Sequence, residues 1–234
     1  MRYQGLDPRL RLAGWAALLV GAGFVLGATA PGALQALVGT VTANPDKLPW
    51  YGTRVFAFLA YLAVAGSVVY GLLLSTKLLD AIAHRPVTFA LHKDLSLAGL
   101  GLAGVHVLLL TLDRTVPFPV AAIVVPFAAP YRPLWVGAGQ VAFILVAVVA
   151  ASFYLRGRLG QRTWRLMHYL AFAAFAGVTA HGIRAGSDSG TPWAWAIYAA
   201  ATSIVVFLLT YRVVVSASVL RSRTRGSAAA GAPG

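Results

Sequence analysis

The chain has 234 residues, of which 59% are hydrophobic and only 11% are charged, against about a quarter in soluble domains. This composition excludes an ordinary soluble domain and predicts an all-α integral membrane protein. The absence of Cys excludes disulfides and cysteine-ligated iron–sulfur or zinc sites within the chain. The net charge of +13 is carried by residues between apolar segments, so we expect a lipid bilayer and no nucleic acid as the partner.

Six segments are long and apolar enough to cross a bilayer, for which a helix needs about 20 residues. They cover residues 10–30, 55–75, 87–112, 134–155, 164–183 and 193–215. The first follows three arginines and is also compatible with a cleaved signal peptide, although its apolar run is long for one. The sequence therefore predicts a bundle of six transmembrane helices.

The distribution of Lys and Arg predicts how this bundle is oriented. With six spans and a cytoplasmic N-terminus, 14 of the 19 cations fall in cytoplasmic segments and five in outer segments. Cytoplasmic loops carry such an excess in multi-pass proteins. We therefore predict a protein of the plasma (inner) membrane with the N-terminus and C-terminus both cytoplasmic, and we call the two sides inner and outer on this basis.

The chain is expected to form a single transmembrane domain over residues 1–225, followed by a disordered tail over residues 226–234. Within the outer segment 113–133, the apolar patch 120–127 is too short to span the bilayer and is expected to form an interfacial or re-entrant cap. The sequence shows no Gly-rich dinucleotide fingerprint and no Walker motif, so no flavin or NAD(P) site is expected within this chain.

Four histidines lie inside the apolar segments: His92 and His106 on the third, and His168 and His181 on the fifth. An ionisable side chain inside a membrane is costly and marks a functional site by default. The spacings of 14 and 13 residues correspond to rises of about 21 and about 20 Å along a helix. Because both segments run from the inner to the outer side, His92 is expected opposite His168, and His106 opposite His181.

Two imidazole pairs at matched depths predict two haem b groups. His92 and His168 would bind the inner haem iron, and His106 and His181 the outer haem iron, each giving its second ring nitrogen to a hydrogen-bond partner. At about 100° per residue, 14 residues return to within about 40° of the same face, but 13 residues leave about 140°. A kink near Gly177 is one way to remove this mismatch.

Haem propionates are anionic and favour cations near the membrane edges. Arg54 is the best candidate for the outer haem, because it opens a span on the side where cations are scarce. Further candidates are Arg85, Lys93 and Arg165 for the inner haem, and Arg114, Arg132 and Arg184 for the outer haem. Each of these residues is also explained as a topology signal or an interfacial anchor.

Two residues near the inner ends complete the set of candidates. Trp164 lies one turn before His168 and is placed to stack against the inner haem, although aromatic residues also gather at membrane interfaces for their own reasons. His84 lies beside Arg85 in an inner loop and is expected to be a solvated histidine.

Together these features resemble the ferric reductase-like transmembrane family, which includes the membrane domains of ferric reductases and NADPH oxidases and the haem subunit of the bacterial methionine sulfoxide reductase system. The resemblance covers roughly residues 50–215. It is carried by the two histidine pairs and by the runs Leu-His-Lys-Asp at 91–94, Pro-Tyr-Arg-Pro-Leu at 130–134 and Trp-Arg-Leu-Met-His at 164–168. It implies two b-type haems that pass electrons from the cytoplasmic to the outer face, with an arginine near the outer haem at the position of Arg54.

The reductases and oxidases of that family carry a flavin and nicotinamide domain that this sequence does not show. We therefore expect an electron-transfer haem subunit, a component of an oxidoreductase, that takes electrons from a separate donor protein or a quinol. The acceptor is expected at the outer face and is a protein or a small molecule.

Two alternatives remain open. The first is a quinol-oxidising haem anchor subunit of a larger complex. The second, of another class, is a metal or proton transporter that uses the intramembrane histidines. A transporter also needs carboxylates within the membrane, whereas all six Asp residues lie in loops or near the ends of spans.

Overall fold

The computed structural model describes residues 32, 39, 42–80, 84–114 and 118–230, with side chains as far as residue 216. These residues confirm the all-α class, because every element among them is a helix. The elements are η1 (Pro45–Lys47), α3 (Leu48–Thr76), α4 (Arg85–Leu112), α5 (Val120–Val124), α6 (Pro133–Leu159), α7 (Gln161–His168), α8 (Leu170–Ala185) and α9 (Pro192–Ala230). The first predicted span, residues 10–30, lies outside the described part of the chain.

Five helical stretches of the described chain are long and apolar enough to cross a membrane. They are Pro45–Thr76, Arg85–Leu112, Pro133–Leu159, Gln161–Ala185 and Pro192–Ser216. They correspond to the second to sixth predicted spans, and the chain is therefore a multi-pass membrane protein. The last helix, α9, continues to Ala230 and so enters the stretch predicted as a disordered tail, where three consecutive alanines at 228–230 favour helix.

Proline and left-handed residues delimit the spanning helices. Pro49, Pro86, Pro133 and Pro192 lie in the first turns of α3, α4, α6 and α9, where a missing backbone N–H leaves no helical hydrogen bond unmade. At the other end, α3 stops at Lys77 with a φ of 59°, and α6 stops at Gly160 with a φ of 76°. The chain can therefore turn back within a few residues after each of these helices.

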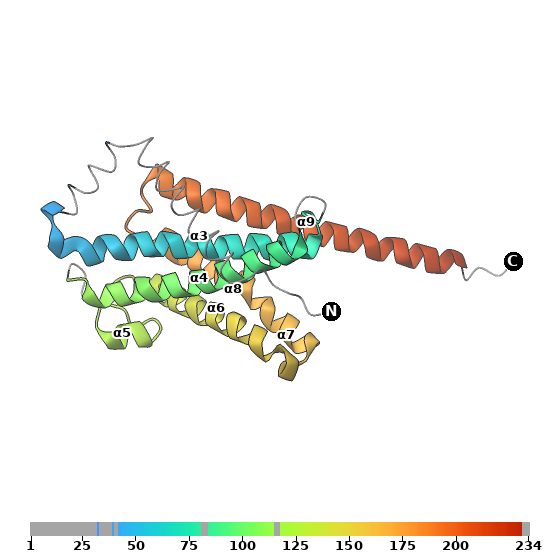
Figure 1. Cartoon of the computed structure of the whole chain (residues 1–234), viewed down its shortest axis with the longest axis horizontal. Coiled ribbons are helices and arrows are strands. Elements are labelled where there is room, and N and C mark those ends of the chain that lie inside the picture. The colour runs from blue at the N-terminus through green and yellow to red at the C-terminus, as the bar shows by residue number, and fades with distance from the viewer. Residues whose placement is uncertain (1–31, 33–38, 40–41, 81–83, 115–117, 231–234) are drawn as a thin grey trace.

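The helices form two hairpins and a closing helix (Figure 1). α3 and α4 pack against each other along their length, and α6 packs against α7 and α8. α9 covers α3 and α8, so that α3 lies between α4 on one side and α8 and α9 on the other. The short helices α5 and α7 lie at opposite ends of the bundle, as Figure 1 shows.

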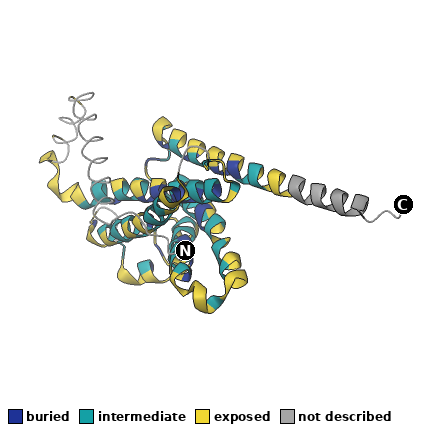
Figure 2. Ribbon diagram, turned by 45° about the vertical axis from the view of Figure 1, so that its right-hand side comes forward, coloured by how far each residue is buried: buried dark blue, intermediate teal, exposed yellow. Residues whose placement is uncertain are grey.

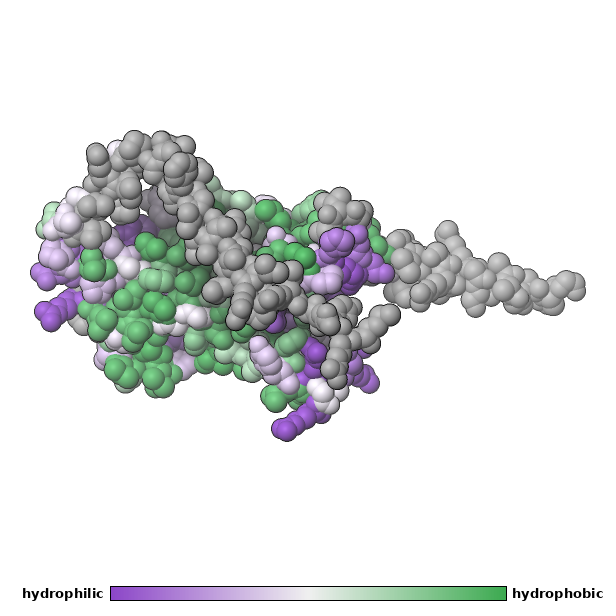
Figure 3. Space-filling view, viewed as in Figure 1, coloured by the Kyte–Doolittle hydropathy of each residue, from purple (hydrophilic) through white to green (hydrophobic). Residues whose placement is uncertain are grey.

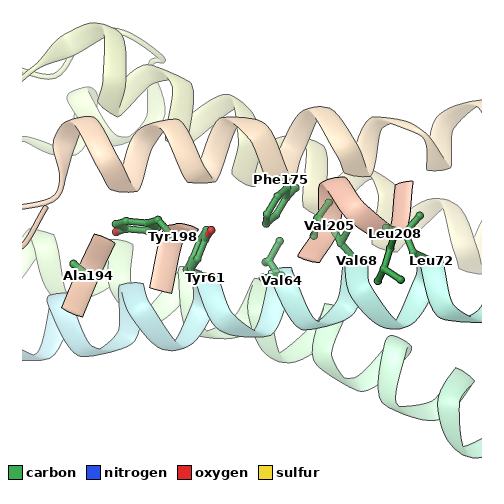
Figure 4. Close-up of a cluster of buried hydrophobic side chains, with 10 residues drawn as sticks. Tyr61, Val64, Val68, Leu72, Phe175, Ala194, Tyr198, Val205 and Leu208 are labelled. Atoms are coloured by element: carbon green, nitrogen blue, oxygen red, sulfur yellow. The ribbon is translucent and has the colours of Figure 1, made fainter. Parts of the chain in front are cut away.

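The buried core lies where α3, α8 and α9 meet (Figure 4). It contains Tyr61, Val64, Ala65, Val68 and Leu72 of α3, Phe175 of α8, and Ala194, Tyr198, Val205 and Leu208 of α9. Leu72 is only 1% exposed. Figure 2 shows the buried residues concentrated along this seam, while the outward faces of the same helices are exposed.

The exposed surface has the apolar character of a lipid-facing bundle. Large apolar side chains such as Val55, Leu108 and Phe207 are more than half exposed, at 55%, 61% and 65%. On the face drawn in Figure 3, hydrophobic residues cover the middle of the bundle and hydrophilic residues gather toward its ends. A contiguous apolar belt of this kind needs a bilayer around it, because soluble monomers rarely expose such a surface.

Glycines set the distance between the helices of each hairpin. A Cβ at Gly99 of α4 would lie 2.8 Å from Cγ2 and 3.2 Å from the backbone N of Val64 in α3. A Cβ at Gly177 of α8 would lie 2.9 Å from the Cβ of Ala142 in α6. Small residues let membrane helices approach closely, and these two glycines do so within the hairpins.

The fifth predicted span is interrupted at Tyr169, directly after His168. α7 ends at His168 and α8 begins at Leu170, and Phe172 N–H bonds the carbonyl of Tyr169 three residues back, as in a tight 3-10 turn. α8 itself runs without interruption through Gly177, the position considered from the sequence. The interruption at Tyr169 changes the angular relation between His168 and His181 that a single straight helix would impose.

We predict that Gly99→Val lowers the stability of the α3–α4 hairpin by about 1–3 kcal/mol, the usual cost of overpacking a close contact. The measurement is thermal unfolding of the detergent-solubilised protein. Gly101→Val is the matched control on the same helix, because no described atom lies within 4 Å of a Cβ placed there. Equal losses for both variants would mean that helix propensity, rather than packing at Gly99, sets the effect.

Candidate functional site

The four intramembrane histidines meet as two pairs between the two hairpins. The rings of His92 and His168 have their centroids 6.0 Å apart with an interplanar angle of 67°. Those of His106 and His181 are 6.4 Å apart with an angle of 73°. We call these the inner pair and the outer pair, after the predicted orientation. Each pair joins α4 to a helix of the other hairpin.

The separation of the rings suits one metal ion between them. A metal bound to one nitrogen of each imidazole at about 2.0 Å, with that nitrogen about 1.2 Å from its ring centroid, places the centroids at most roughly 6.4 Å apart. The outer pair matches this value, and the inner pair is 0.4 Å closer, at 6.0 Å. The same distances and angles also describe direct edge-to-face contacts between two rings.

Three of the four rings are fixed by a hydrogen bond to a backbone carbonyl of a neighbouring helix. His92 Nδ1 donates to the carbonyl of Ser67 at 2.8 Å, and His106 Nδ1 donates to that of Thr53 at 2.8 Å. His181 Nδ1 donates to the carbonyl of Trp135 at 2.9 Å. A proton held on Nδ1 leaves Nε2 as the nitrogen with a lone pair, which is the state of a metal-binding imidazole.

The bonds between α3 and α4 are reciprocal and repeat along the hairpin. Thr53 Oγ1 donates to the carbonyl of His106 at 3.0 Å, and Ser67 Oγ donates to that of His92 at 3.1 Å. Thr53 and Ser67 are 14 residues apart on α3, as are His92 and His106 on α4. The hairpin therefore repeats one contact two heptads apart, a spacing that keeps residues on the facing sides of two packed helices.

Two glycines leave the space that the rings occupy. A Cβ at Gly139 of α6 would lie 2.5 Å from Nδ1 and 2.7 Å from Cγ of His181. A Cβ at Gly71 of α3 would lie 3.1 Å from Cε1 of His92. Each glycine lies one helical turn after the residue whose carbonyl accepts the hydrogen bond, Trp135 or Ser67. In both cases the carbonyl binds the imidazole, and the glycine one turn later leaves room for the ring against the backbone of the neighbouring helix.

His168 differs from the other three histidines. Its Nδ1 is buried and has no hydrogen-bond partner among the described residues, and the same is true of Nε1 of Trp164. The Trp164 ring packs on the His168 ring with centroids 5.3 Å apart and an angle of 34°. Trp164, considered from the sequence both as an interfacial aromatic residue and as a stacking partner of the inner haem, lies against the His168 ring.

The outer pair borders a large cavity of about 510 Å³. Its wall includes both histidines of the pair, Gly139, and the aromatic residues Tyr61 and Tyr198. It is predominantly apolar and extends from the middle of the bundle, at Val64 and Gly99, to the outer rim at Asp113 and Asp188. Cofactor sites have this size and character, with a few polar groups in an apolar lining.

The apolar patch predicted as a cap forms one wall of this cavity. Its residues fold into α5, and Ala122 and Ile123 line the cavity. Gln140 of α6 holds the cap in place: its Nε2 donates to the carbonyls of Ala122 and Ile123 at 2.8 and 2.7 Å, and its Oε1 accepts the Phe127 N–H at 3.3 Å. A polar side chain within a span is thus used to dock a segment over the cavity.

Arg54 lies at the rim of the cavity, but it is paired within the protein. Its Nε donates to Oδ2 of Asp188 at 2.6 Å, and its Nη2 contacts Oδ1 of the same carboxylate. Its guanidinium carbon also lies 4.2 Å from the centroid of the Trp50 ring. The sequence predicted a cation here for an anionic ligand, and the structure adds a carboxylate counter-ion.

The other candidate cations lie at the ends of the bundle in varied surroundings. Arg132 donates to the carbonyl of Arg184, whose guanidinium carbon lies 5.0 Å from the Trp135 ring. At the inner end, Arg85 bonds Asp80 at 2.9 Å. His84 is exposed at the start of α4, as expected of a solvated residue. None of these contacts brings a cation into the cavity lining beside Arg54.

Each histidine pair offers two imidazoles to a metal ion or a metal-containing cofactor. Among the described residues, no three His, Cys, Asp or Glu side chains lie together in a way that could hold a metal ion. At the outer pair, the ring separation and the adjoining apolar cavity fit a haem. At the inner pair, the ring separation fits as well.

Sequence reasoning identified the histidines but missed the residues that hold them. Thr53 and Ser67 carry a usable signal, since their 14-residue spacing equals that of the histidines on the next span. Gly139 and Asp188 carry none, because a glycine in a membrane helix and an aspartate in a loop are common. No protein-family model, no curated protein and no solved structure matches this chain.

We predict that Thr53→Val lowers the stability of the protein by about 1 kcal/mol, the net value of one buried hydrogen bond, because it removes the hydroxyl bonded to the His106 carbonyl. Thermal unfolding in detergent measures the effect. Thr111→Val is the control, because that hydroxyl is exposed and bonds Leu108 within its own helix. A Thr53→Val protein as stable as the control would contradict the reciprocal contact.

Proposed function

We propose that this protein is a transmembrane b-type di-haem cytochrome, the electron-transfer component of an oxidoreductase. The observation that carries the proposal is the pairing of four intramembrane histidines from α4 and from α7 and α8, at ring separations of 6.0 and 6.4 Å. Histidines buried in a membrane bundle mark a functional site, and these separations suit one metal ion between the rings of each pair.

In this proposal His92 and His168 bind one haem iron, and His106 and His181 bind the other. The haems supply the one-electron redox chemistry, while the protein supplies ligands, spacing and an apolar surrounding. The carbonyls of Ser67, Thr53 and Trp135 hold three of the ligand rings in one tautomer and orientation, and strengthen them as ligands. The four histidines would hold the two haems, and the bound haems would exchange electrons with the donor and the acceptor.

The two pairs define a path across the bundle. His92 and His106 are 14 residues apart on the continuous helix α4, so the sites are separated by about 21 Å along the helix axis. The excess of Lys and Arg in the predicted cytoplasmic segments orients the bundle, with the inner pair toward the cytoplasm and the outer pair toward the outer side. A donor protein or a quinol then delivers electrons at the inner pair, and a protein or small molecule collects them at the outer face.

The structure gives less support to a metal or proton transporter. Such a protein needs further ligands or carboxylates beside the histidines, and the described residues bring no third His, Cys, Asp or Glu to either pair in a metal-binding group. A quinol-oxidising anchor subunit shares the haem sites and differs only in its donor. Testing whether a quinol or a soluble flavoprotein reduces the purified protein distinguishes these two functions.

We predict that protein purified after haem-replete expression and reduced with dithionite shows b-type α and Soret bands, with about two haems per chain. His106→Ala or His181→Ala removes about one haem, and His92→Ala or His168→Ala removes the other, because each change deletes one axial ligand. His84→Ala is the control and keeps both haems. Colourless wild-type protein would refute the proposed function, and loss of both haems or neither in every single variant would refute the pairing.

We predict that Gly139→Ala lowers the haem content at the outer pair selectively, because the new methyl group would lie 2.5 Å from Nδ1 of His181 and must displace the ring. Haem content and the reduced spectrum measure the loss. Gly157→Ala on the same helix is the matched control, since no described atom lies within 4 Å of a Cβ there. Unchanged haem content in Gly139→Ala would show that the ring does not need this gap.

A further inference from the structure

A partly buried ion pair joins the first membrane helix of the described chain to the loop between α8 and α9, with the Arg54 side chain 29% exposed and that of Asp188 10% exposed. Arg54 lies in the second turn of α3, and Asp188 lies 134 residues later in the chain. The two side chains make a side-on, two-point contact through Nε and Nη2. Such bidentate pairing fixes the plane of the guanidinium as well as its position.

Asp188 is itself firmly placed. It is only 7% exposed, and its backbone carbonyl accepts the Thr191 N–H at 2.9 Å and the Thr191 hydroxyl at 2.7 Å. The next residue, Ser189, ties the loop to α8, because its Oγ donates to the carbonyl of Gly182 at 2.7 Å. The carboxylate therefore arrives at Arg54 from a loop that has little freedom to move.

Arg54 is held from a second direction by Trp50, whose ring lies 4.2 Å from the guanidinium carbon. Arg54, Asp188 and Trp50 all line the cavity that contains the outer pair. The contact with Asp188 uses Nε and Nη2, so it does not use the N–H groups of Nη1. The next residue before Arg54, Thr53, is the one whose carbonyl and hydroxyl hold His106.

We infer that Asp188 is a positioning residue: it holds Arg54 in one orientation at the rim of the outer cavity and cancels its charge there. The inference rests on the proposed function for the identity of the cavity's occupant, an outer haem. Held in this way, Arg54 presents Nη1 to an anionic group of the occupant. Because Asp188 cancels its charge, the two side chains together exert little electrostatic field at the iron. The pair, rather than the arginine alone, sets the electrostatics of the outer site.

Removing either charge of the pair is expected to shift the midpoint potential of the outer haem in a defined direction. A positive charge near a haem stabilises its reduced form and raises its midpoint potential, and a negative charge lowers it. Asp188→Asn leaves Arg54 uncompensated, so the outer midpoint rises. Arg54→Gln leaves Asp188 uncompensated, so the outer midpoint falls. In Arg54→Gln/Asp188→Asn both charges are gone, and the outer midpoint returns close to that of the wild type.

The experiment is a potentiometric titration of the purified holoprotein, wild type and these three variants, followed in the reduced α-band. The outer component is the one that is lost in His106→Ala. Opposite shifts in the two single variants, recovery in the double variant and an unchanged inner midpoint support the inference. Asp188→Glu serves as the conservative variant, in which a retained carboxylate keeps the midpoint near the wild-type value.

The inference is overturned if Asp188→Asn leaves the outer midpoint unchanged, or if it shifts that midpoint in the same direction as Arg54→Gln. The first result would mean that Asp188 exerts no field at the site. The second would mean that losing Asp188 only releases Arg54. A double variant that matches Arg54→Gln alone would equally exclude charge cancellation.

A second arm does not depend on haem. Asp188 is buried, so removing Arg54 leaves a buried carboxylate without its counter-charge, which is more damaging than removing both partners. In apoprotein from a haem-deficient host, each single variant is expected to unfold at a lower temperature than the wild type, and the double variant at a higher temperature than either single variant. If the wild type binds no haem, the proposed function fails, but these unfolding measurements still test the contact between Arg54 and Asp188. A double variant whose loss of stability equals the sum of the two single losses would overturn the inference.

Discussion

The hydrogen bond from a buried imidazole to a backbone carbonyl of the neighbouring helix is the interaction on which this structure depends. In the interior of a helix each carbonyl already accepts one backbone hydrogen bond, so it accepts a second one from another helix only where that helix comes close. Gly99 brings α4 against α3, and Gly139 admits His181 against α6. Close packing, tautomer and ligand orientation therefore follow from the same contacts.

This constraint explains the architecture around the proposed sites. Each hairpin is closely packed within itself, while the facing sides of the two hairpins meet at the histidine rings and enclose the outer cavity. The arrangement at the two ends is unequal. Both outer rings are tied to carbonyls, whereas His168 of the inner pair relies on Trp164 and on the short helix α7. Both rings of the outer pair are therefore hydrogen-bonded to backbone carbonyls, against one ring of the inner pair.

Polar residues in this bundle act mainly by placing other groups. Gln140 docks the α5 cap, Thr53 and Ser67 bind α4, and Asp188 holds Arg54. Each of them is buried or partly buried and hydrogen-bonded, as polar groups in an apolar surrounding must be. The proposed redox function accordingly depends on residues that never touch iron.

The sequence by itself determined the class of the protein, five spans that the described structure contains, and the four histidines, because hydropathy and the cost of a buried imidazole are local properties of the chain. It also indicated which histidines share a depth, since helical rise is fixed. Only the tertiary structure decided where the fifth span breaks, which carbonyls and glycines hold the rings, and that Asp188 meets Arg54. These features depend on close approach between segments far apart in the chain, and rise and periodicity along one helix carry no information about such contacts.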